Sequence, residues 1–266
     1  MKLKYVKIAW VVGVSCMSLG SARAEDPAPV AVSLDVPVLS AYVWRGQVLN
    51  DEIVIEPSLT VSKNGFSLNA WANFNGAGSY SGDNNSKFSE VDLTASYTHS
   101  AGPASLGVGV VQYLFPNQTL TVTDGTETTG KAYPGTYEVY ITAGFPGIPL
   151  APALTIYRDL DAIEGFYGVL SVSQSFSLHE KVSLVAFASL GAGDKKYNNG
   201  YFGDDEAALN DANVGLSLPI ALTSSLTIKP SASYTCLPDS TLRDAAEAVY
   251  GNKDQFVGSI TASYAF

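Results

Sequence analysis

Apolar and polar residues alternate with a period of two along most of the chain, and the final segment shows this pattern clearly. Between residues 255 and 266, one face is apolar and the other is small or hydroxylated. The apolar face carries Phe256, Gly258, Ile260, Ala262, Tyr264 and Phe266. A strand of about ten residues with two such faces is typical of a barrel wall between lipid and an aqueous lumen.

The same alternation predicts twelve strands. They cover residues 31–44, 53–62, 66–75, 88–98, 104–115, 134–145, 150–158, 165–177, 182–192, 212–220, 226–237 and 255–266. Twelve is an even number, as in bacterial single-chain barrels whose termini are both periplasmic. The predicted fold is therefore all-β: a transmembrane, antiparallel, up-and-down β-barrel with both termini in the periplasm.

The connections between these strands alternate in length, which supports the same topology. The short ones are residues 63–65, 99–103, 146–149, 178–181 and 221–225, and the mostly longer ones are 45–52, 76–87, 116–133, 159–164, 193–211 and 238–254. Short periplasmic turns and long surface loops are usual in outer-membrane barrels.

Two of the long loops contain elements of their own. Residues 119–128 alternate around an Asp124-Gly125 turn signal, which predicts a hairpin that continues strands five and six above the membrane. Residues 239–251 predict a short surface helix, because Asp239 or Ser240 can cap its start and Gly251 can end it.

Aromatic residues are expected on the outer face at both ends of the strands, where lipid headgroups lie. The surface end is predicted to carry Tyr42, Trp44, Phe74, Tyr137 and Phe166, and the periplasmic end Phe66, Tyr97, Phe145, Phe176, Tyr264 and Phe266. A soluble β-sandwich, which would place such aromatics in its core, is the alternative fold.

Five residues fit this pattern poorly. Four prolines fall inside predicted strands, so either bulges or shifted boundaries are expected there, and Gln174 faces outward. The prolines are Pro37, Pro57, Pro152 and Pro230.

The N-terminus has the features of a secretory signal peptide. Lys2, Lys4 and Lys7 precede a short apolar region, and Ala22-Arg23-Ala24 forms an A-x-A cleavage site. Residues 1–24 are therefore predicted to be removed, which leaves residues 25–266 as one barrel domain in the bacterial outer membrane.

Charge and cysteine content exclude several classes of partner. The chain has 25 acidic residues against 15 basic ones, four of which lie in the predicted signal peptide, so nucleic acid is not an expected partner. Cys236 is the only cysteine after residue 24, which excludes an internal disulfide and a multi-thiolate metal site. No cofactor or metal motif is apparent, and we predict none.

The inward face of the predicted barrel carries the candidate functional residues. Nine of them are expected to line the pore or its constriction: Arg45, Glu56, Trp71, Glu90, Asp92, Tyr113, Glu138, Tyr140 and Asp159. Their aromatic side chains narrow the lumen, and the excess of carboxylates should attract cations. The hypothesis is a cation-leaning constriction with Arg45 opposite Glu56. In the alternative, Arg45 pairs with Glu56 or Glu138 and only cross-links strands.

Enzymatic activity is not expected. The chain has only two histidines, His99 and His179, and both fall in predicted periplasmic turns. No arrangement of nucleophile, base and acid follows from the spacing. The predicted function is a narrow, porin-like channel for passive diffusion of small solutes or ions. The alternative is a non-conducting structural or adhesive barrel that acts through its surface loops.

Several short motifs resemble a known family. They are Ser40-Ala41-Tyr42-Val43-Trp44-Arg45-Gly46-Gln47, Gly65-Phe66, Trp71-Ala72-Asn73, Glu90-Val91-Asp92, Tyr113-Leu114-Phe115-Pro116 and Tyr137-Glu138-Val139-Tyr140. Together they resemble the TorF-type porins over about the first half of the mature chain, with Trp44 where that family usually has Phe. The resemblance implies an outer-membrane channel of unassigned substrate.

The C-terminal residues carry a second resemblance. Phe266, preceded two residues earlier by Tyr264, resembles the C-terminal signature of outer-membrane proteins. This resemblance implies recognition by the barrel-assembly machinery. Outer-membrane lipid and lipopolysaccharide are then the expected surroundings of the barrel.

Overall fold

The computed structural model of the protein describes residues 29–77, 87–124, 127–132 and 134–266. The predicted signal peptide, with its cleavage residues Ala22 and Ala24, lies outside the described residues. Most of the second predicted surface loop and the turn at residues 125–126 also lie outside them.

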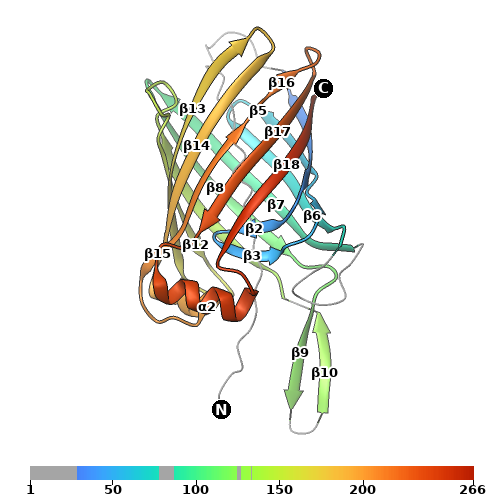
Figure 1. Ribbon diagram of the computed structural model, residues 1–266, viewed down its shortest axis with the longest axis vertical. Coiled ribbons are helices and arrows are strands. Elements are labelled where there is room, and N and C mark those ends of the chain that lie inside the picture. Colours follow the sequence, from blue (N-terminus) through green and yellow to red (C-terminus); the bar gives the residue numbers. More distant parts are fainter. Residues whose placement is uncertain (1–28, 78–86, 125–126, 133) are drawn as a thin grey trace.

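Strands pair side by side into one closed antiparallel sheet (Figure 1). The segments of this wall are β1 (Ala31–Leu39), β4 (Val54–Ile55), β5 (Ser58–Lys63), β6 (Phe66–Asn75), β7 (Lys87–Ala101), β8 (Ala104–Leu114), β11 (Thr136–Gly144), β12 (Ala153–Asp159), β13 (Phe166–His179), β14 (Val182–Gly193), β15 (Ala208–Ser217), β16 (Ile220–Ala221), β17 (Leu226–Cys236) and β18 (Asp254–Ala265).

The barrel closes because β1 pairs with β18, from Ser33 opposite Ala265 to Leu39 opposite Ser259. Both β4 and β5 pair with β1 and with β6, so they are two parts of one wall strand. In the same way β15 and β16 both lie between β14 and β17. The wall therefore has twelve strands, as the alternation predicts.

The prolines explain both interruptions of the wall. Pro37 lies within β1 beside the gap between β4 and β5, where Pro57 lies, and the Glu56 N–H donates to the Pro37 carbonyl. Pro230 lies within β17, and its carbonyl accepts from the Leu218 N–H at the gap between β15 and β16. Each missing N–H thus meets a break in the neighbouring strand. Pro152, predicted inside a strand, precedes β12.

The two ends of the barrel differ as predicted. The C-terminus lies at the end with the short turns, and the opposite end carries the helices and the long connections (Figure 1). We call these the short-turn end and the loop end. His99 and His179 are exposed at the short-turn end, in the last residues of β7 and β13 rather than in the turns themselves.

The outer face of the wall is apolar. Leu68, Val108, Ile141 and Ile260 are among the side chains that stay more than half exposed. Exposed aromatics flank this belt: Tyr137 and Phe166 toward the loop end, and Phe66, Tyr97, Phe145, Phe176, Tyr264 and Phe266 toward the short-turn end. A wall of this kind is typical of a barrel that faces lipid.

Gln174 is the polar exception on the outer face that the alternation predicts. Its side-chain oxygen accepts a hydrogen bond from the Leu150 N–H at 3.0 Å, in the connection between β11 and β12. The amide therefore satisfies a backbone donor of the neighbouring connection.

The first predicted strand, residues 31–44, is wrong in its last part. It ends at Leu39, and the chain then turns inward as a small hairpin, β2 (Tyr42–Trp44) and β3 (Gln47–Asn50). Tyr42 and Trp44, predicted to face lipid, are 3% and 1% exposed. The reason is the hairpin turn at Arg45 and Gly46, which have φ angles of +45° and +81° and reverse the chain.

The other elements lie at the loop end. They are the hairpin of β9 (Thr119–Asp124) and β10 (Glu127–Ala132), and the helices α1 (Lys195–Phe202) and α2 (Ser240–Tyr250). The predicted hairpin over residues 119–128 and the predicted helix over 239–251 are confirmed. Helix α1 was not predicted, and β15 begins at Ala208 rather than at residue 212 because α1 shortens the loop. Neither helix of the described chain is long and apolar enough to cross a membrane.

Candidate functional site

The candidate site lies inside the barrel at the loop end, around Arg45. The hairpin formed by β2 and β3 fills this part of the lumen, and nearly all of its side chains are buried. The apolar core of the molecule gathers at the same end, where buried aromatics from the wall, the hairpin and both helices meet. The barrel is therefore occupied here by its own first loop.

Arg45 forms a buried, bidentate ion pair with Glu138 of β11. Its two terminal nitrogens donate to the two carboxylate oxygens at 2.9 and 2.7 Å. The Tyr113 hydroxyl of β8 also donates to Glu138, at 2.7 Å. All three residues are less than one-tenth exposed. Fork-to-fork geometry of this kind is among the strongest polar contacts in proteins.

Aromatic rings surround the guanidinium group. Its central carbon lies 4.2 Å from the ring centre of Tyr167 and 4.5 Å from those of Trp44 and Tyr157. Tyr197 of α1 adds a fourth ring at 5.7 Å. Burial raises the pKa of the Tyr197 and Tyr201 hydroxyls well above the ordinary value, so these rings stay neutral.

The helices hold the hairpin in place. Asp194 caps α1 by accepting from the Tyr197 N–H at 2.8 Å, which starts the turn that directs Tyr197 and Tyr201 inward. In α2, the Tyr250 hydroxyl lies 2.6 Å from the side-chain oxygen of Gln47 and 2.9 Å from the Tyr201 carbonyl oxygen. The hydroxyl thus links the hairpin to both helices.

A second group of acids lies beside the hairpin. The Tyr42 hydroxyl donates to Glu90 of β7 at 3.0 Å, and the Tyr42 ring lies 6.0 Å from that of Trp71 on β6. Asp92 follows Glu90 on the same inner face of β7 and is 5% exposed. Glu56, between β4 and β5, is 7% exposed.

Two of the predicted pore residues, Tyr140 and Asp159, contact other wall strands and the loop after β12. Tyr140 lies against Gly109 of β8, where a Cβ atom would meet its ring, and its ring centre lies 5.3 Å from that of Tyr157. Asp159 accepts from the N–H groups of Asp161, Ile163 and Glu164 and from the Thr136 hydroxyl. Asp159 therefore holds the loop after β12.

A cavity of about 280 Å³ remains between the hairpin and the opposite wall. Arg45 and Glu56 both line it, and β13, β14, β15 and β17 contribute further side chains. These include Asp211, which accepts a hydrogen bond from the Tyr167 hydroxyl at 2.8 Å, and the ring of Phe187. Because Arg45 lines it, the cavity lies beside the ion pair.

The structure brings most of the predicted site residues together. Arg45, Tyr113 and Glu138 form one hydrogen-bonded group, with Glu90, Asp92 and Trp71 around Tyr42 beside it. The sequence left two ion-pair partners open for Arg45, Glu56 and Glu138, and in the structure the Arg45 side chain is bidentate to Glu138. Because Arg45 and Glu138 are 93 residues apart, no local sequence pattern indicates that they are partners.

Several site residues were missed. Tyr167 and Asp211 face inward on their strands, and the period of two predicts this once β15 is extended to Ala208. Tyr197 and Tyr201 are four residues apart between a capping Asp194 and a terminal Gly203, which is a helix signal within a loop.

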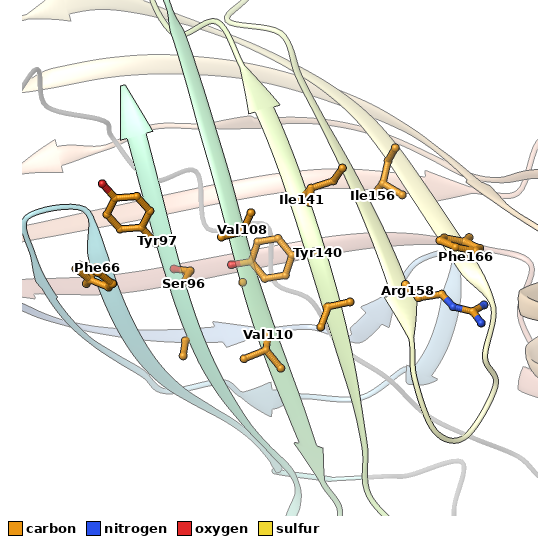
Figure 2. Close-up of a pocket in the computed structure, with 13 residues that line it drawn as sticks. Phe66, Ser96, Tyr97, Val108, Val110, Tyr140, Ile141, Ile156, Arg158 and Phe166 are labelled. Carbon is orange, nitrogen blue, oxygen red and sulfur yellow. The ribbon is translucent and has the colours of Figure 1, made fainter. Parts of the chain in front are cut away.

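The outer wall has shallow apolar grooves of another kind. One of them, of about 610 Å³, runs across β7, β8, β11 and β12, with Phe66 and Phe166 at its two sides and Val108, Val110, Ile141 and Ile156 between them (Figure 2). It lies on the face that we expect to contact lipid. Among the described residues, no group of three or more His, Cys, Asp or Glu side chains could hold a metal ion.

Comparison with known proteins supports the fold. A family model described as "Bacterial protein of unknown function (Gcw_chp)" matches residues 23–237. No curated protein matches the sequence. Among solved structures, the NanC porin is similar over 87% of this chain and 98% of that chain, with 13% identity and a TM-score of 0.52.

Two further solved structures have slightly lower TM-scores. The KdgM porin has 10% identity and a TM-score of 0.49 and is covered over 99% of its length, against 89% of this chain. The COG4313 outer membrane channel from Pseudomonas putida F1 has 12% identity and a TM-score of 0.48, over 94% of this chain and 100% of that one. At such low identity the similarity to the NanC porin concerns the fold alone.

Proposed function

The chain belongs to the Gcw_chp family of bacterial proteins of unknown function, and we propose that it is a porin-like channel of the bacterial outer membrane. In this proposal the barrel allows passive diffusion of small solutes or ions, and the short-turn end faces the periplasm. The apolar outer belt contacts lipid and lipopolysaccharide. Residues 1–24 act as the signal peptide, and the C-terminal strand is recognised by the barrel-assembly machinery.

One observation carries the proposal: a closed barrel with a polar inner wall that narrows at an inward-folded loop. From the short-turn end the inner wall presents mainly Ser, Thr and Asn side chains, such as Ser62, Ser67 and Asn69. Toward the loop end it meets the hairpin of β2 and β3 and the ion pair of Arg45 with Glu138. An inward loop with fixed charges is a natural selectivity element in a barrel.

The charge around the hairpin favours cations. Six acidic residues and one arginine of the described chain are buried here and in the adjoining wall: Glu56, Glu90, Asp92, Glu138, Asp159, Asp211 and Arg45. Since Glu138 neutralises Arg45, the remaining carboxylates dominate the potential that an entering ion meets.

The motifs that resemble those of the TorF-type porins come together in one site. The segment from residue 40 to 47 forms the hairpin turn, and the motifs at residues 90–92, 113–116 and 137–140 supply Glu90, Tyr113 and Glu138. These four motifs, far apart in the sequence, meet around Tyr42 and Arg45 through direct hydrogen bonds. We therefore propose membership of the TorF type as well.

Planar bilayer recording of the refolded barrel tests this function. In a KCl gradient we expect small single-channel conductance with a reversal potential that favours K⁺ over Cl⁻. Arg45→Ala should raise the conductance and the cation preference, because it removes the one buried positive charge from the hairpin. Arg158→Ala is the matched control, since this arginine lies on the outer wall beside Phe166.

Anion selectivity would contradict the cation-leaning constriction. Absence of conductance from a correctly folded barrel would instead support the second candidate function, a non-conducting barrel that acts through its surface loops. One feature favours that candidate: Trp44, Tyr113 and Tyr197 are packed at the loop end with at most 1% exposure. Loss of stability without any change in conductance in Arg45→Ala would favour it too.

A further inference from the structure

Glu56 differs from Glu138 and Asp211, two other buried acids at the loop end. It is 7% exposed and lines the cavity beside the hairpin. Its carboxylate has no hydrogen bond or ion pair within the described parts of the chain, where only its backbone N–H is bonded, to Pro37. By contrast, Glu138 is paired with Arg45, and Asp211 accepts from Tyr167.

A buried carboxylate without a partner is costly and calls for an explanation. The cavity that it faces offers one. Asp211 supplies a second carboxylate to its wall, and Asn213, which also lines it, has a buried side-chain oxygen without a hydrogen-bond partner in the described chain. Within the described chain, the Glu56 carboxylate and the Asn213 side-chain oxygen thus receive no hydrogen bond, whereas Asp211 accepts one from Tyr167.

The aromatic side chains of the cavity wall add a second preference. Tyr157 and Phe187 both border it. Aromatic faces attract ammonium groups as well as alkyl chains. Arg45 lies in the same wall, but its guanidinium is already bound to Glu138 and packed against aromatic rings. We therefore do not expect it to bind an anion in the cavity.

We propose that this cavity binds a small organic cation with an ammonium group. The ammonium donates hydrogen bonds to Glu56, and its carbon chain lies against Tyr157 and Phe187. A volume of about 280 Å³ is just below the range of about 300–1,000 Å³ for drug-sized ligands, so the ligand is a small amine. Binding of amines to this site does not require the proposed channel function. Only the further step, that such amines are the class of solute that passes through the barrel, rests on that function.

Isothermal titration calorimetry of the refolded full-length barrel in uncharged detergent tests the site. The probe is n-butylammonium chloride, with sodium butyrate and 1-butanol as the anionic and neutral controls. We expect saturable binding of butylammonium and none of butyrate. Glu56→Gln should weaken binding at least about tenfold, because a charge-assisted contact is lost. Asp35→Asn should leave it unchanged, since Asp35 faces Ser263 outside the cavity.

Glu56→Gln removes no protein contact of the side chain, so the variant should fold; heat-modifiable migration on gels checks this. If it does not fold, Phe187→Leu replaces it and should weaken binding about threefold by removing one aromatic face. Equal affinity in wild type and variant, tighter binding of butanol than of butylammonium, or no binding overturns the site. If the barrel conducts ions but does not bind butylammonium, only the proposed site is contradicted. If it binds butylammonium but does not conduct, the proposed channel function is contradicted.

Discussion

At the scale of single residues, the pair of Arg45 and Glu138 has more to do with specificity than with net stability. Moving both charges out of water costs about as much as their attraction returns. Geometry is what the pair provides: two parallel hydrogen bonds fix the hairpin against β11, and the rings around the guanidinium leave one orientation. Loss of one partner alone is therefore more damaging than loss of both.

Arg45→Ala should lower the free energy of unfolding by about 3–5 kcal/mol, because it leaves Glu138 buried with its charge uncompensated. The double variant with Glu138→Gln should recover part of this loss. Denaturant unfolding of the barrel in lipid vesicles measures both. Lys253→Ala, which breaks the exposed pair of Lys253 with Glu247, is the control and should cost about 0–1 kcal/mol. A double variant no more stable than Arg45→Ala would contradict the pairing as the cause.

At the scale of elements, turn and capping residues predicted helix α2 correctly, whereas apolar alternation did not predict every strand boundary. The signals at Asp239 and Gly251 predict α2, and Asp239 indeed accepts from the Thr241 and Leu242 N–H groups. The strand predicted for residues 31–44 failed after Leu39, because apolar alternation continues into a hairpin that is buried in the lumen instead of in lipid. Alternation of apolar and polar residues predicts that one face of a strand avoids water, but not whether lipid or protein covers that face.

Asp239→Ala should loosen α2 without unfolding the barrel. Loss of an N-cap costs about 1 kcal/mol, which corresponds to about fivefold faster amide hydrogen exchange in the first turn of the helix. Exchange measured by mass spectrometry on peptides covering residues 240–250 checks this. Asp244→Ala is the control, since Asp244 is exposed within the same helix. Unchanged exchange in Asp239→Ala would show that tertiary contacts alone hold α2.

At the scale of the whole molecule, the lining of the lumen differs between the two ends of the barrel. Toward the short-turn end the inner face is lined by small polar residues, whereas the loop end is filled by the hairpin and the aromatic side chains of both helices. Outside, one apolar belt surrounds the wall. A protein with its core at one end and its largest apolar surface outside is suited to a membrane rather than to water.

Lysine substitutions test what the outer belt contacts. Ile260→Lys, near the middle of β18, should cost about 2–4 kcal/mol in lipid vesicles, because a charge at the bilayer midplane is costly. Leu222→Lys is the control in the turn between β16 and β17 and should cost about 0–1 kcal/mol. Equal, small costs would indicate that the belt does not face lipid.

The sequence by itself determined the twelve strands, the faces of the wall and the alternation of short turns with long loops. These features depend on a period of two and on turn residues such as Asn64 and Gly65, whose physical causes act between neighbours in the chain.

Only the tertiary structure decided that residues 41–50 fill the lumen, that Arg45 binds Glu138 instead of Glu56, and that Glu56 faces a cavity. These outcomes depend on which side chains fit together once the wall has closed. Packing across 93 residues leaves no periodic trace in the chain.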